Sequence, residues 1–225
     1  MGKHKSCMKN IFLRNLLLGM LLPFVIILMV IAVQIDRDVQ EDKAETYSTM
    51  AVMIANNVNA VVQQYVSVVE TAADNENVAS MDYRKAETYL NEIISDSGNV
   101  WSHFLITDSE GIEIAHTDGE ENHGTSIADR EYYSTPWNEG KTVICEPTFS
   151  KSTGRRILAI GTPIYRDGKK VGVLVGFVRL EYISTVVNDY RITDKNYAFM
   201  LNSDGMLSAH PNGYGYPDEY SPRTV

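Results

Sequence analysis

Cysteine is scarce in this chain, which has only Cys7 and Cys145 among its 225 residues. The sequence also lacks a CxxC pair, a phosphate-cradling glycine loop and a nucleophile with a base close by. A folded domain must therefore be stabilised by its hydrophobic core, without a dense disulfide framework. We expect no cofactor and no enzymatic activity, although a catalytic triad assembled only in space would leave no trace in the sequence.

Charged residues are absent between Arg14 and Asp36, where twenty-one positions read NLLLGMLLPFVIILMVIAVQI. A helix of that length spans roughly 30 Å, the thickness of the hydrocarbon core of a bilayer. The alternative is a cleaved signal peptide, whose apolar region is normally about 7 to 15 residues long. The longer run and the poor cleavage site in IAVQIDRD favour an uncleaved transmembrane helix.

The charges that flank this run are unequal, because Lys3, Lys5, Lys9 and Arg14 precede it and acidic residues dominate after it. The positive-inside rule then places the N-terminus in the cytoplasm and everything after residue 36 outside. The two cysteines lie on opposite sides of the membrane and cannot pair. The net charge of −9 argues against nucleic acid as a partner.

One stretch occurs twice: FLITDSEGIEIAH at 104–116 returns ninety-four residues later as AFMLNSDGMLSAH at 198–210. Gly111 aligns with Gly205 and His116 with His210. Each copy has the pattern of a β-hairpin, with an apolar strand, a polar turn that contains Gly, and a second strand. The chain therefore reads as two tandem modules, of which the second has only begun, and we expect it to be a fragment.

A stripe of apolar residues at alternating spacings of four and three predicts one long helix over 36–74 that continues the transmembrane helix. We expect this stripe to pack on the globular domain. Whether it also meets a second copy of itself in a homodimer is left open. Its members are Tyr47, Ala51, Ile54, Val58, Val61, Tyr65, Val68 and Ala72.

The remaining elements predict an α+β module, in which an antiparallel sheet of five strands is covered by helices on one side. Asp82 is placed to cap a helix over Tyr83–Ser95, and Arg166, Asp167 and Gly168 form the turn of a second hairpin. The other predicted elements are a short helix over Asp129–Trp137, strands over Thr142–Cys145, Arg156–Ile164 and Val171–Leu180, a tight turn over Lys151–Gly154, and a helix over Glu181–Ile192.

The order of these elements resembles the double Cache family of bacterial extracytoplasmic sensor domains. DREYY at 129–133 and the run GTPIYRDGKKVGVLVGFVRLEYI are similar to that family's pocket helix and closing strands. The resemblance implies a PAS-like membrane-distal module that holds a small ligand, an inner-membrane location, and a cytoplasmic output domain that is missing here. The implied parts are a cytoplasmic N-terminus (1–14), a transmembrane helix (15–35), a stalk helix (36–79), the distal module (80–192) and the start of a proximal module (193–225).

An amino-acid-binding subset of that family carries a Tyr, an Arg, two aromatic residues, a Tyr and two Asp. Arg130, Tyr132 and Tyr133 match the central part of this pattern, whereas Thr125, Thr148, Ser150 and Phe177 stand where the first Tyr, the later Tyr and the two Asp would be. The resemblance implies a ligand site with Arg130, Tyr132, Tyr133, Thr148, Ser150 and Phe177.

An α-ammonium group in a partly dry pocket needs an anion, and Phe177 supplies none. Arg130 can still hold a carboxylate with its planar fork of donors. We therefore expect a small carboxylate or another polar metabolite rather than a standard amino acid. The competing readings are an ion pair of Arg130 with Asp129 or Glu131, and plain core packing for Tyr132, Tyr133 and Trp137.

An acidic loop contains His116, Asp118, Glu120, Glu121 and His123, a combination that could bind a divalent metal. The two His are seven residues apart in a Gly-rich loop, which fixes no ligand geometry, so we expect a solvated loop and no metal. The main hypothesis is a membrane sensor for a small ligand. The alternative is a membrane-anchored interaction or scaffold protein with a tightly packed core and no ligand.

Overall fold

The computed structural model describes residues 2–98, 100–119, 123–149, 156–190, 197–203 and 207–209. The chain divides into two compact units, Met1–Met53 and Ile54–Val225. One helix, α1 (Gly2–Asp74), runs through the first unit and into the second without a break at Pro23. The second unit contains the sheet.

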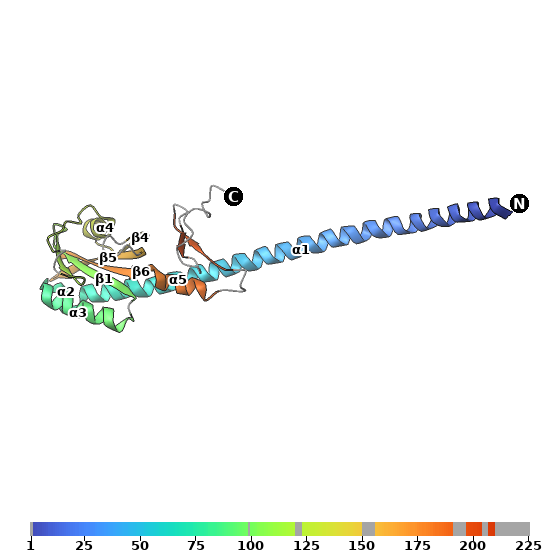
Figure 1. Cartoon of the computed structure of the whole chain (residues 1–225). Helices are drawn as coiled ribbons and strands as arrows, with labels where there is room; N and C mark the ends of the chain where they lie inside the picture. Colours follow the sequence, from blue (N-terminus) through green and yellow to red (C-terminus); the bar gives the residue numbers. More distant parts are fainter. Residues whose placement is uncertain are drawn as a thin grey trace. The chain divides into compact units, whose positions relative to one another are not determined.

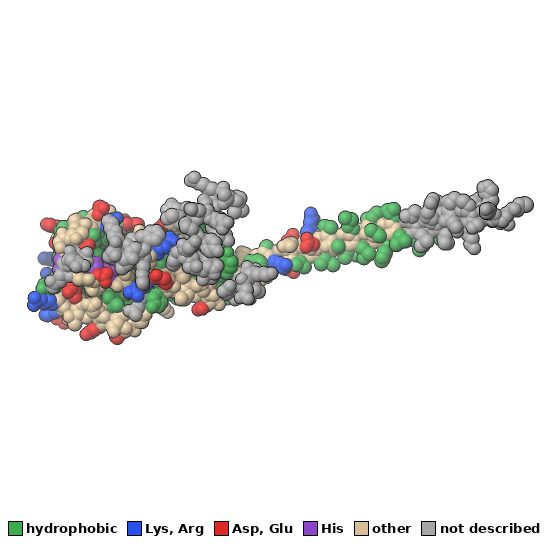
Figure 2. Space-filling view, in the orientation of Figure 1, with side chains coloured by type: hydrophobic (Ala, Val, Ile, Leu, Met, Phe, Trp, Pro, Cys, Tyr) green, Lys and Arg blue, Asp and Glu red, His purple; other side chains and the backbone are tan. Residues whose placement is uncertain are grey.

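The part of α1 over Gly19–Asp74 includes an apolar stretch that is long enough to cross a membrane, and none of that stretch is buried inside the chain. Figure 2 shows apolar side chains around the described part of the first unit, followed by charged ones. A surface that is apolar all round suits lipid rather than water. The observation agrees with the transmembrane helix predicted from the sequence.

The second unit is built on an antiparallel sheet in which the strands lie in the order β2-β1-β6-β5-β3, with β4 also paired to β5 (Figure 1). This sheet and the helices confirm the predicted α+β class. The strands are β1 (Trp101–Thr107), β2 (Glu113–His116), β3 (Val143–Ile144), β4 (Thr148–Phe149), β5 (Arg156–Arg166) and β6 (Lys169–Arg179). The helices beside α1 are α2 (Glu76–Ala79), α3 (Tyr83–Asp96), α4 (Glu131–Glu139) and α5 (Leu180–Asn188).

One face of the sheet packs against α1, α3 and α5 and forms the larger core. Trp101 and Phe104, near the start of the first strand, are fully buried here. Asp82 caps α3 as expected, because its carboxylate accepts hydrogen bonds from the backbone N–H groups of Arg84 and Lys85. Apolar contacts of this core join the stalk helix to the domain, and two side-chain hydrogen bonds add to them, from Asn57 to Tyr190 and from Thr142 to Glu70.

The stripe on α1 packs on the domain from Ile54 onward, which confirms the expected packing. Its register differs from the prediction: Val66 and Val69 are buried, whereas Val61 and Val68 are only partly buried. The predicted stripe has a period of 3.5 residues. A straight α-helix has 3.6 residues per turn, so its buried face drifts away from the predicted positions. Tyr47 and Ala51, earlier in the stripe, are exposed.

The opposite face of the sheet is covered by α4, and this corrects the expectation that helices lie on one side only. Tyr133 from α4 joins a second core cluster with Leu105, Val175 and Phe177 of the sheet. A Cβ atom built on Gly161 would lie 1.9 Å from the backbone oxygen of Tyr132. The backbone of α4 therefore lies directly on β5, a contact that only glycine permits.

The two copies of the repeated stretch pair in the same way. In the first hairpin Ile106 faces Ala115, and the register then shifts so that Thr107 faces Glu113. In the second, β7 (Met200–Leu201) pairs with β8 (Leu207–Ala209): Met200 faces Ala209, and after the same shift Leu201 faces Leu207. Each pair lies ninety-four positions after its counterpart, so the duplication extends to the irregularity itself.

The turn between β5 and β6 is the two-residue hairpin that the sequence predicted. Asp167 and Gly168 have φ angles of 53° and 73°, and positive φ at both positions is the mark of a type I′ turn. Helix α5 begins at Leu180 and ends at Asn188, earlier than the predicted Ile192. The predicted turn at 151–154 and the aligned His210 lie outside the described residues.

Candidate functional site

Arg130 precedes the first turn of α4 and has extended backbone angles, so its side chain leaves the chain where the loop meets the helix. That side chain is 40% exposed, and its Nε lies 3.8 Å from a carboxylate oxygen of Asp129. The distance is long and the pair is exposed, so the contribution of this ion pair to stability is small. The guanidinium is therefore held only weakly by Asp129.

Tyr132, two residues further on, turns toward the sheet and meets Phe177 edge to face, with ring centroids 5.5 Å apart. Phe177 in turn stacks on His103 at 4.2 Å, and His103 stacks on His116 at 4.9 Å. The row Tyr132, Phe177, His103, His116 thus runs from α4 across three strands. Burial raises the pKa of the Tyr132 hydroxyl, while Arg130 acts in the opposite direction.

Tyr133 faces another way. Its ring stacks on Trp137, and its hydroxyl donates a hydrogen bond to the backbone oxygen of Ser109 at 3.0 Å. A Cβ atom on Gly111, whose φ is +77°, would lie 2.9 Å from the Tyr133 ring. Core packing accounts for all these contacts. Tyr133 therefore acts as a core residue, which was the competing interpretation of this position in the sequence.

The remaining motif positions are Thr125, Thr148 and Ser150, and none of them belongs to the aromatic row. Thr148 is exposed in β4, opposite Ile157. Ser150 lies outside the described residues. Thr125 is exposed, and its backbone oxygen accepts a hydrogen bond from the N–H of Glu113. Of the predicted site residues, Tyr132 and Phe177 are in ring contact, and Arg130 lies two residues before Tyr132 at the start of α4.

Two buried titratable residues at this site were not found from the sequence. Burial lowers the pKa of His103 to about 3, and the neighbouring His116 adds to the effect, so His103 is neutral at neutral pH. Glu113 is 6% exposed, and burial raises the pKa of its carboxyl to about 7.

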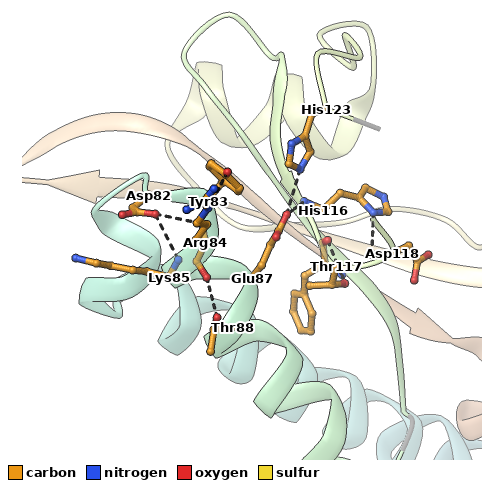
Figure 3. A network of polar contacts seen from close by, with 11 residues as sticks. Asp82, Tyr83, Arg84, Lys85, Glu87, Thr88, His116, Thr117, Asp118 and His123 are labelled. Atoms are coloured by element: carbon orange, nitrogen blue, oxygen red, sulfur yellow. Dashed lines mark hydrogen bonds and ion pairs between the residues drawn. The ribbon is translucent and has the colours of Figure 1, made fainter. Parts of the chain in front are cut away.

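The acidic loop next to the site is organised by Glu87 of α3 (Figure 3). One oxygen of Glu87 accepts a hydrogen bond from the backbone N–H of His116 and lies 3.1 Å from Nε2 of His123. The N–H of Asp118 donates to Nδ1 of His116. His116 is thus buried and hydrogen-bonded at the end of β2. Among the described residues, no three such side chains form a metal site.

The family model described as Cache domain matches residues 31–220. The chain belongs to the Cache domain family. This confirms the resemblance to the double Cache sensor domains, and the match covers the helix after the membrane span, the sheet module and the second hairpin.

The methyl-accepting chemotaxis protein McpG of Pseudomonas putida is 22% identical to this chain over 176 residues, which make up 77% of the chain and 27% of McpG. The chain spans between 13% and 27% of the length of the curated relatives that it matches. All comparison with those relatives therefore concerns one part of a longer protein.

Two solved structures share the fold of this Cache chain. One is the ligand-binding domain of the Pseudomonas aeruginosa chemoreceptor PctC with GABA, at a TM-score of 0.61 and 18% identity over 75% of each chain. The other is that of the Pseudomonas fluorescens chemoreceptor CtaA with L-serine, at a TM-score of 0.62 and 20% identity over 77% of this chain and 74% of that one. At these identities the likeness concerns the fold.

Proposed function

We propose that this Cache chain is the extracytoplasmic sensor portion of a bacterial transmembrane receptor, and that its distal module binds a small ligand with a carboxylate group. The observation that carries the proposal is the placement of Arg130 at the start of α4, next to Tyr132 and the buried Phe177. A guanidinium with one long, exposed ion pair has donors to offer to a carboxylate. PctC and CtaA, solved with GABA and L-serine, support a ligand of this size.

The signal would leave the module through α1. Ile54, Val58, Val66 and Val69 bind this helix to the sheet face opposite α4, and the helix continues without a break into the apolar span. With the N-terminus in the cytoplasm, as the flanking charges predict, ligand binding would bias the position of a rigid rod that enters the membrane. An output domain on the cytoplasmic side would receive this signal.

Arg130→Ala is expected to abolish carboxylate binding, because the remaining neutral side chains cannot offset the cost of removing a carboxylate from water. The measurement is calorimetry on the full chain in lipid nanodiscs against a panel of small carboxylates, with a loss of at least about tenfold expected. Lys141→Ala is the matched control, because the Lys141 side chain is a cation just after α4 and is 66% exposed. This variant should bind the panel as the wild type does.

Two outcomes would speak against the sensor. If no panel member binds the wild type, the scaffold alternative gains. If Arg130→Ala binds as well as the wild type does, the carboxylate is not held where we propose. Arg130→Lys adds a further check, because a single ammonium restores the charge without the planar fork and should restore only part of the affinity.

We also propose that the receptor is a homodimer through the stripe on α1. Ala51 belongs to the stripe and is exposed, as is Met53 on another side of the helix. Under oxidising conditions Ala51→Cys should form an intermolecular disulfide in membranes, whereas Met53→Cys should not, because the two positions point about 200° apart on a helix with 3.6 residues per turn. Equal crosslinking at both positions would contradict the stripe as the interface.

A further inference from the structure

Glu113 of β2 is a buried acid to which the fold supplies few hydrogen-bond partners. It is 6% exposed, and its Oε2 has no hydrogen-bond partner among the described residues. A carboxylate removed from water without full compensation is costly. Such a group persists in a fold when something other than stability retains it.

The hairpin itself does not require an acid at this position. Glu113 faces Thr107 directly after the register shift, and the equivalent pair in the second hairpin is Leu201 and Leu207. The same backbone irregularity is therefore built once with a carboxylate and once with an apolar residue. The acid at position 113 is therefore a feature of the first module, and the hairpin fold does not require it.

Glu113 lies on the face of the sheet that α4 covers. Its partner Thr107 also faces Val173, which is part of the core cluster under α4. The Oγ1 of Thr107 is buried and has no hydrogen-bond partner among the described residues either. Two neighbouring oxygen atoms that can accept hydrogen bonds are thus directed to the same side as Tyr132.

Tyr132 links this pair of oxygens to Arg130. Its hydroxyl is influenced by the positive charge of Arg130 and the negative charge of Glu113, in opposite directions. The site therefore contains a cation at the N-terminus of α4 and an acid on β2, and the ring of Tyr132 lies near both. Phe177, which contacts Tyr132, supplies no charge at its own position.

We propose that Glu113 is the acidic contact of the ligand site and that the ligand presents a cationic amine to it. The inference rests on the proposed function, because it assigns the carboxylate end of the same ligand to Arg130. An ammonium group that leaves water needs an anion, and its remaining N–H can be bonded by Thr107 Oγ1. The ligand class then narrows from small carboxylates to small carboxylates that also carry an amine.

The test uses pairs of compounds that differ only in the amine, GABA with butyrate and β-alanine with propionate, on the full chain in nanodiscs. The wild type should bind the amine-bearing member of at least one pair about tenfold or more tightly. Glu113→Gln should remove that preference. Equal binding of both members by the wild type, or a preference that survives Glu113→Gln, would overturn the assignment.

The panel separates this inference from the proposed function. If only amine-free carboxylates bind, and do so through Arg130, the sensor stands and the role of Glu113 falls. If no compound binds the wild type, the proposed function falls, and the assignment of Glu113 falls with it. A second measurement tests Glu113 without any ligand.

Glu113→Leu reproduces the residue of the second hairpin and should raise the thermal unfolding midpoint at pH 8 by about 3 °C or more, because it removes a buried and poorly paired charge. Glu110→Leu, at an exposed acid in the turn of the same hairpin, should change the midpoint far less. A lower midpoint for Glu113→Leu would show that the folded chain itself bonds this carboxylate, and would overturn the proposal whatever the binding panel shows.

Discussion

Gly161→Ala is expected to destabilise the distal module by about 3 kcal/mol, a severe effect for a single added methyl group. The new Cβ would lie 1.9 Å from the backbone oxygen of Tyr132 and 3.2 Å from Cγ of Pro136. Neither atom belongs to a flexible side chain, so the whole of α4 must move away from β5. The measurement is the free energy of unfolding from urea titration of wild type and variant.

The control for this variant is Gly168→Asn in the turn between β5 and β6. A Cβ there meets nothing within 4 Å, and asparagine tolerates the positive φ of this position. The change should cost no more than about 0.5 kcal/mol. A Gly161→Ala variant as stable as the wild type would contradict the direct backbone contact between α4 and β5, and with it the placement of Arg130 and Tyr132 over the sheet.

Local patterns predicted the parts of this fold that depend on neighbours in sequence. The repeated stretch gave both hairpins, the pair Asp167 and Gly168 gave the type I′ turn, and Asp82 gave the start of α3. Each of these features is decided within a few residues by backbone angles or by one side chain that bonds a nearby N–H.

The candidate site was only partly predictable, because its chemistry depends on contacts between distant segments. Phe177 is separated from His103 by seventy-four positions, yet their rings stack. A lone Glu in a short strand reads as a solvent-facing residue under simple alternation, and only the register shift between Ile106 and Thr107 places Glu113 under α4. The position of α4 itself follows from Gly161, whose role cannot be recognised before the helix is seen to lie on it.

The stability of the wild type is expected to fall as the pH rises from 4.5 to about 7, through Glu113. In the unfolded chain this carboxyl has its ordinary pKa of 4.5, and in the folded chain burial raises it to about 7. Between these values the folded state binds more protons than the unfolded state, so the free energy of unfolding decreases as the pH increases. At 1.36 kcal/mol per pKa unit the decrease is on the order of 3 kcal/mol, and it ends above pH 7.

Other carboxylates and histidines also titrate in this range, so the measured quantity is the difference between wild type and Glu113→Gln. Urea unfolding at pH 4.5, 5.5, 6.5 and 8 should show that the variant gains on the wild type as the pH rises, and that the gain levels off above 7. The charge of His123 acts on the Glu113 carboxyl and opposes the effect of burial on its pKa. The series is therefore repeated in a His123→Gln background, where the gain should be at least as large, because His123 lowers the pKa of Glu113. A gain that vanishes in this background would assign the effect to the imidazole, and a difference that stays constant with pH would mean that Glu113 is ionised in the folded chain throughout.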